Sequence, residues 1–325
     1  MRPDRNAQLV ISIDLEMSWG SVHHGHPHDP TPYRFEREIV ADVLTAMERY
    51  GIAATWAVVG HLFLDGCAPI EGVKHPEIVR PRYPWLGGDW YDLDPTTTAA
   101  DAPTWYGPDL IETIRACAIP QEIASHSFGH IIVGEPGCSP DAFATDLAAC
   151  RTVAEATGTD LRSFVYPRNS IGHLDVLARS GFTAFRGPTP VRFAGSPPWR
   201  RRLLSLLDRV RPLAATAVYP AWRNGLIDVP QTYLFDPGSR LARRLGPRLW
   251  PLLVRRRLRH AVRTGSLFHL WFHTHNLAAD REGARLAMDV VFAEARAHID
   301  RGRLESVTMG QVAERMAGGA HGPQH

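Results

Sequence analysis

The 325-residue chain has an ordinary globular composition, with 44% hydrophobic and 22% charged residues and a formal net charge of +2. This length fits one large domain or two modest ones, and the small net charge excludes a strongly basic nucleic-acid-binding protein. The four cysteines form no CxxC motif, and we expect reduced thiols in a cytosolic protein. We recognise neither a secretory leader nor a transmembrane run, so a cytoplasmic location is expected.

Alternating strand and helix patterns extend along the chain. An apolar run over residues 9–16 predicts a first buried strand, and residues 36–50 have helical spacing that ends at Gly51. Residues 64–105 are rich in Pro, Gly, Asp and Trp, which is typical of a long functional loop. Further strands are predicted over residues 53–60, 122–125, 161–167, 182–186, 226–229, 266–272 and 304–307, and further helices over 108–117, 140–157, 171–179 and 282–300. This alternation predicts a mostly parallel sheet.

Polar side chains follow several of these predicted strands at the point where each strand ends. The carboxyl ends of parallel strands meet at one edge, so we expect these side chains to form a site there. They are Asp14 and Glu16 after the first strand, His126 after the third, Arg168 and Asn169 after the fourth, and His273 and His275 after a late one.

Two histidines four residues apart, His126 and His130, give the clearest chemical signal. If a helix begins there, both side chains lie on one helical face and can bind one divalent metal. Two histidines and one carboxylate leave coordination positions open, which is typical of a hydrolytic rather than a structural metal site. The alternative is a chance pair, because sixteen histidines in one chain will produce some such spacings.

With these motifs in order, the chain resembles the polysaccharide deacetylase family, the NodB-homology metal-dependent carbohydrate esterases, over roughly residues 8–315. Ser12-Ile-Asp-Leu-Glu16 resembles the first family motif in a D-x-E form. The segment His126-Ser-Phe-Gly-His130 matches H-[ST]-x-x-H, and Leu270-Trp-Phe-His273 resembles the last motif. The third motif departs from the family pattern, because Phe164-Val-Tyr-Pro-Arg-Asn169 keeps the proline but has no arginine two positions before it.

The resemblance implies a role for each of these residues. Asp14 would be the catalytic base and His273 the general acid, with His275 as the rival acid. Glu16, His126 and His130 would bind one divalent metal, most simply zinc, with cobalt, nickel, manganese or iron as alternatives.

An arginine is expected to orient the base, and either Arg168 or Arg186 is placed to do so. Asn169, His275, Trp90 and Tyr91 are expected to contact substrate. For the aromatic residues, packing of the loop is an equally good interpretation, and His61 is expected to be structural.

The resemblance also implies an α/β fold, a distorted (β/α) barrel in a single domain over residues 8–317, with tails at 1–7 and 318–325 and a basic insertion at about 190–262. The implied activity is removal of an N-acetyl group from an amino sugar in a glycan, glycan precursor or glycosylated small molecule. Two alternatives are a related amidohydrolase acting on a non-sugar amide or cyclic ureide, and a non-catalytic glycan-binding relative.

The basic insertion has its own pattern. Nine arginines lie between Arg240 and Arg263, and no acidic residue occurs from Pro237 to Ala279. Such a segment could make peripheral contact with an anionic membrane or hold a phosphate-bearing substrate. A solvated basic face over a structural insertion is slightly favoured, because Pro247 and Pro251 are expected to interrupt a long helix.

Overall fold

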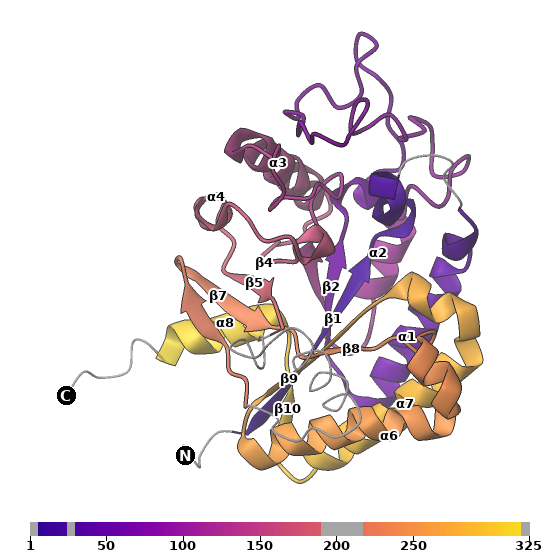
Figure 1. Cartoon of the computed structure of the whole chain (residues 1–325), viewed down its shortest axis with the longest axis vertical. Coiled ribbons are helices and arrows are strands. Elements are labelled where there is room, and N and C mark those ends of the chain that lie inside the picture. The colour runs from indigo at the N-terminus through magenta and orange to yellow at the C-terminus, as the bar shows by residue number, and fades with distance from the viewer. Residues whose placement is uncertain (1–5, 25–29, 190–216, 320–325) are drawn as a thin grey trace, which may run out of the picture.

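A computed structural model describes residues 6–24, 30–189 and 217–319 of the chain. Its centre is a ten-stranded sheet in the order β6-β7-β5-β4-β3-β2-β1-β9-β8, with β10 pairing beside β1 (Figure 1). Every pairing is parallel except that of β6 with β7. The strands are β1 (Ala7–Leu15), β2 (Thr55–Val58), β3 (Glu122–Ser125), β4 (Ser163–Phe164), β5 (Ala184–Gly187), β6 (Ala221–Arg223), β7 (Leu226–Pro230), β8 (Tyr233–Leu234), β9 (Leu267–His273) and β10 (Leu304–Ser306).

Helices surround this curved sheet, and the predicted distorted (β/α) barrel in a single domain is confirmed (Figure 1). The α-helices are α1 (Glu36–Tyr50), α2 (Pro108–Arg115), α3 (Pro140–Ala156), α4 (Leu174–Arg179), α6 (Arg240–Thr264), α7 (Arg281–Ile299) and α8 (Met309–Gly319). The short 3-10 helices are η1 (Met17–His24), η2 (Thr31–Tyr33), η3 (Gly60–Phe63), η4 (Pro167–Asn169) and η5 (Thr274–Asp280).

The first strand lies in the middle of the sheet because its sequence is apolar on both faces. Leu9, Val10, Ile11 and Ile13 are all buried, as expected for a parallel strand covered on both sides. The strand pairs with β2 and β9, and this register places Asp14 opposite His273. The helix that follows, α1, ends where Gly51 adopts a left-handed conformation with φ 63°.

The basic insertion agrees with its prediction at one of the two prolines. The helix α6 spans Arg240–Thr264 and is interrupted at Gly246, whose φ is 73°, directly before Pro247. Pro247 falls in the first turn after this break, where its missing N–H costs little, and the helix continues through Pro251. Trp250, Val254 and Leu258 are buried, and Arg255 and Arg259 bind Glu294 of α7. The first part of the insertion, residues 190–216, lies outside the described residues.

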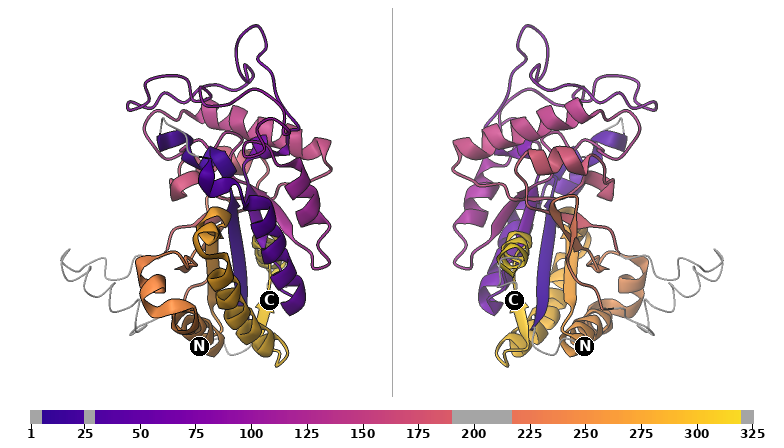
Figure 2. Two further views of the ribbon diagram at one scale, coloured as in Figure 1. Left: turned by 90° about the vertical axis from the view of Figure 1, so that its right-hand side faces the viewer. Right: turned by 90° about the vertical axis from the view of Figure 1, so that its left-hand side faces the viewer.

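A long segment without helix or strand, residues 64–107, joins η3 to α2. It lies at the end of the molecule opposite the N-terminus, beyond the carboxyl ends of the central strands (Figure 2). Among the described residues, no helix is both long and apolar enough to cross a membrane.

Candidate functional site

The carboxyl ends of β1, β3 and β9 bring four ionisable side chains together. Asp14 belongs to the end of β1, and Glu16 follows it directly. His126 follows β3, and His273 is the last residue of β9. Asp14, Glu16 and His126 are almost completely buried, whereas His273 is partly exposed, so the group is open to solvent on the side of His273.

Glu16 and the two motif histidines form a group of metal-ligand type. Glu16 Oε1 lies 3.0 Å from His126 Nε2 and 3.1 Å from His130 Nε2. The Nδ1 atom of His126 is 2.7 Å from the Val165 carbonyl oxygen, which can only accept a hydrogen bond. His126 Nδ1 must therefore carry the proton, so that the lone pair of Nε2 in the neutral ring faces a carboxylate. A cation bound between these atoms removes that repulsion, and the donor set suits a divalent metal.

The charge state of these ligands also suits a metal. Burial acts to raise the pKa of Glu16, but the neighbouring histidines, His273 first, hold this pKa well below its usual range. Burial lowers the pKa of His130 and favours its neutral ring. A carboxylate and neutral imidazoles are the forms that bind metal.

The turn that carries His126 and His130 is not the helix expected from the sequence. Ser127 and His130 have φ values of 68° and 59°, which a right-handed helix does not allow. Asp146 of α3 stabilises this turn instead, because its oxygens accept hydrogen bonds from Phe128 N at 2.9 Å, Gly129 N at 3.2 Å and Ser127 Oγ at 2.9 Å. Asp146 is a site residue that sequence reasoning missed, since nothing local to α3 indicates the contact.

Arg186 of β5 holds Asp14 by a bidentate ion pair. Its Nη1 is 2.5 Å from Asp14 Oδ1, and its Nη2 is 2.7 Å from Oδ2. Burial acts to raise the pKa of Asp14, but the charge and hydrogen bonds of Arg186, together with the charges of His273 and His126, lower it. Of the two arginines considered from the sequence, Arg186 makes this contact, whereas Arg168 is exposed. Asn169 lies beside the pair and accepts a 3.3 Å hydrogen bond from Arg186 Nη2.

His273 lies beside both carboxylates. Its Nε2 is 3.5 Å from Asp14 Oδ2 and 3.4 Å from Glu16 Oε1. Burial acts to lower the pKa of His273, but the two carboxylates raise it to about 9. The rival acid, His275, lies in η5 with its ring 5.0 Å from that of His273. Burial lowers the pKa of His275 to about 4, so at neutral pH His273 is the better proton donor of the two.

His269 is linked to Arg186 through the hydroxyl group of Ser12. Its Nε2 is 2.9 Å from Ser12 Oγ, and Ser12 also accepts a hydrogen bond from Arg186. Burial lowers the pKa of His269 to about 3, which keeps the ring neutral. A neutral, fully buried ring fits a structural role for His269.

Trp90 and Tyr91 do not lie where a sugar could stack on them. Both are buried, with 1% and 0% of their surface exposed. The indole N–H of Trp90 donates a 2.6 Å hydrogen bond to the Gly129 carbonyl, and the ring of Tyr91 packs under Arg80. The expectation that they bind substrate is wrong, because their apolar surface packs the loop onto the turn over residues 126–130, the motif turn.

Three solved structures share this fold. A "putative polysaccharide deacetylase" from Mycobacterium smegmatis is 17% identical, with a TM-score of 0.62 over 100% of this chain and 95% of that one. A "probable polysaccharide deacetylase" from Pseudomonas aeruginosa PAO1 is 12% identical, with a TM-score of 0.61 over 97% and 92%. Puue allantoinase is 12% identical, with a TM-score of 0.59 over 99% and 94%.

No family model matches the sequence, and no curated protein matches it. The two deacetylase structures with this fold confirm, at the level of the fold, the resemblance that the motifs predicted.

Proposed function

We propose that the protein is a metal-dependent hydrolase that removes the acetyl group from an N-acetylated amino sugar. The observation that supports this most directly is the contact of one oxygen of Glu16 with the Nε2 atoms of both His126 and His130, beside the Asp14–Arg186 pair. A divalent metal held by Glu16, His126 and His130 would supply Lewis-acid polarisation of the amide carbonyl and would lower the pKa of a water molecule.

The chain itself supplies the proton transfers in this proposal. Asp14 is ionised, and Arg186 fixes both of its oxygens, so it can accept a proton from the attacking water. His273 carries a proton at neutral pH and lies at the more exposed side of the site, where it can protonate the departing amine. An amine leaves poorly without a proton, so both an acid and a base are needed.

A second candidate uses the same groups on a different amide. A base, an acid and a carbonyl-polarising metal would also open a cyclic ureide, and Puue allantoinase has this fold. The burial of Trp90 and Tyr91 removes the aromatic platform that the sequence suggested for a sugar. A purely glycan-binding role is disfavoured, because Asp14, Glu16, His126, His130 and His273 are all present and converge.

The test compares two probes, N-acetylglucosamine oligomers and allantoin, by release of acetate and by ring opening. We expect acetate release by the wild-type protein and a loss of at least about 10²-fold in Asp14→Asn, because the general base is removed. Metal content should be unchanged in that variant, and Asp160→Asn, an exposed change before β4, should behave as wild type. Full activity of Asp14→Asn contradicts the mechanism, and turnover of allantoin alone favours the second candidate.

A further inference from the structure

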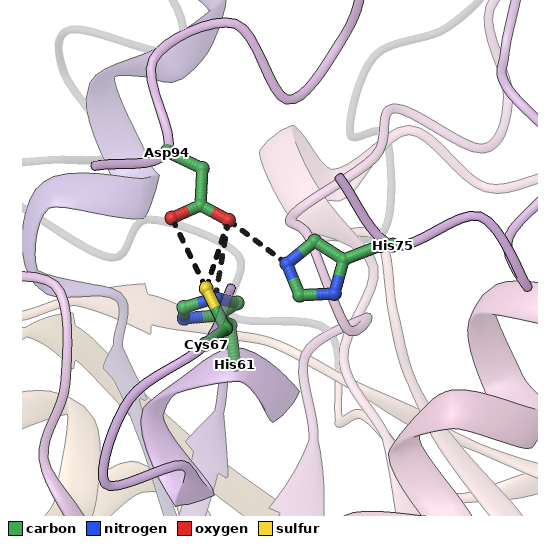
Figure 3. Close-up of side chains that lie close together, drawn as sticks. All are labelled: His61, Cys67, His75 and Asp94. Atoms are coloured by element: carbon green, nitrogen blue, oxygen red, sulfur yellow. Dashed lines mark hydrogen bonds and ion pairs between the residues drawn. The ribbon is translucent and has the colours of Figure 1, made fainter. Parts of the chain in front are cut away.

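A second group of ligating side chains lies outside the site described above. His61 of η3 and Cys67, His75 and Asp94 of the 64–107 segment place their ligand atoms within 4.8 Å of one another. His61, His75 and Asp94 are buried, and Cys67 is half-buried. Figure 3 shows the four side chains pointing toward a common centre. None of them belongs to the group formed by Glu16, His126 and His130.

Two of the three distances from Asp94 to the other ligand atoms fit a tetrahedral metal site, and the third, to His75, is shorter. Around a zinc ion with ligands at about 2.0–2.3 Å, neighbouring ligand atoms are roughly 3.3–3.8 Å apart. Asp94 Oδ2 is 3.4 Å from Cys67 Sγ, 3.4 Å from His61 Nε2 and 2.8 Å from His75 Nε2. One thiol, two imidazoles and one carboxylate are all ligands that zinc accepts, and together they complete a four-coordinate shell.

The proton on His61 gives an independent reason to place a cation here. His61 Nδ1 is 3.3 Å from the Trp105 carbonyl oxygen, an acceptor, so this nitrogen carries the hydrogen. The Nε2 atom of His61 is buried and has no hydrogen-bond partner. In the neutral ring the lone pair of this nitrogen faces Asp94 Oδ2 at 3.4 Å, and a cation bound between the two atoms would remove their repulsion.

The phenol group of Tyr106 is placed to donate a hydrogen bond to the sulfur of Cys67. The phenol oxygen of Tyr106 accepts a hydrogen bond from Thr97 N at 3.1 Å, which leaves its own hydrogen for Cys67 Sγ at 3.3 Å. The ammonium group of Lys74 is committed to three backbone carbonyl oxygens, including that of Asp94. A thiolate, a carboxylate and two neutral imidazoles together balance the charge of one divalent ion.

We infer that His61, Cys67, His75 and Asp94 form a second metal site, structural in kind and best suited to zinc. Four protein ligands leave no open position for a substrate, unlike the Glu16 group. The hydrogen bond from His61 to the Trp105 carbonyl and the one from Tyr106 to Cys67 resemble those that orient metal ligands in general.

The proposed metal site lies between the long loop and the turn that carries His126 and His130. Residues 64–107 form no helix or strand of their own, and a loop of this length needs an additional source of order. Both η3 and this loop pack against the turn that carries His126 and His130. His61 N of η3 donates to Phe128 O at 3.0 Å, and Trp90 Nε1 of the loop donates to Gly129 O. The rings of His61 and His75 both contact Phe128. A metal held here would therefore fix the outer side of the turn that carries His126 and His130.

Cobalt substitution tests the inference, because a thiolate bound to Co²⁺ gives a charge-transfer band in the near ultraviolet and the Glu16 group contains no sulfur. We expect the stripped wild-type protein to take up about two equivalents of Co²⁺ and to show this band. The Cys67→Ser variant should lose the band and one equivalent. The matched control is Cys117→Ser, a half-buried cysteine outside the group, which should keep both.

His126→Ala separates this site from the proposed catalytic centre. In that variant the cobalt content should fall by about one equivalent while the thiolate band stays, whether or not any substrate is turned over. Absence of the band in wild type and His126→Ala, or its persistence in Cys67→Ser, overturns the inference. If Cys67→Ser does not fold, the spectrum of His126→Ala still decides the question.

Discussion

At the scale of single residues, the ion pair with Arg186 fixes the orientation of Asp14, the proposed base. Each carboxylate oxygen of Asp14 accepts one hydrogen bond, from a different terminal nitrogen of the Arg186 guanidinium. Arg186 also lies over the Trp271 ring, 4.6 Å from its centroid. Arg186 is 2% exposed, so removal of its charge leaves Asp14 buried and unpaired.

Arg186→Gln is therefore expected to lower the free energy of unfolding by about 3–5 kcal/mol, the usual effect of breaking a buried ion pair. Hydrolytic activity should fall with it, because Asp14 loses its fixed orientation. Urea denaturation and the acetate-release assay measure the two effects. Arg168→Gln is the matched control, and its exposed side chain should change the free energy of unfolding by less than about 0.5 kcal/mol. Equal effects of the two variants would contradict the assignment.

At the scale of elements, the first turn of α1 buries a carboxyl group beside the site. Glu36 is fully buried, and burial raises its pKa from 4.5 to about 8. Between these two pH values the folded chain binds a proton that the unfolded chain has lost. The free energy of unfolding therefore decreases as pH rises through this window and levels off above about pH 8.

Glu36→Gln is expected to remove this dependence and to stabilise the protein at pH 8 by an amount on the order of a few kcal/mol. Denaturation midpoints measured from pH 5 to 9 provide the test. Glu38→Gln, an exposed change on the same helix, should follow the wild-type curve. A wild-type slope retained by Glu36→Gln would show that Glu36 is not the group responsible.

Elements and residues differ in how far the sequence predicts them. The bounds of α1 follow from apolar spacing and Gly51, both local signals, and the structure gives the same residues. The motif turn was expected as a helix because i,i+4 spacing is typical of one, but Asp146, distant along the chain, stabilises a turn with positive φ. The choice between Arg168 and Arg186 could not be made from sequence, because proximity in sequence to the third motif says nothing about which strand faces Asp14.

At the scale of the whole molecule, the order of the strands determines the site. Residues that are far apart in the chain meet because β3, β2, β1 and β9 are neighbours in the sheet. Strand alternation predicted a common edge, and that was enough to group Asp14, Glu16, His126 and His273. It could not group His61, Cys67, His75 and Asp94, because residues 64–107 have no periodic pattern from which proximity follows.

We propose that Glu16, His126 and His130 hold a divalent metal at the carboxyl end of the sheet. The metal content of purified wild-type protein and of His126→Ala, measured by elemental mass spectrometry, tests this proposal. His126→Ala is expected to contain about one equivalent less of a divalent metal than wild type and to lose hydrolytic activity. The same metal content in both proteins, or an active wild-type protein that contains no metal, would contradict it.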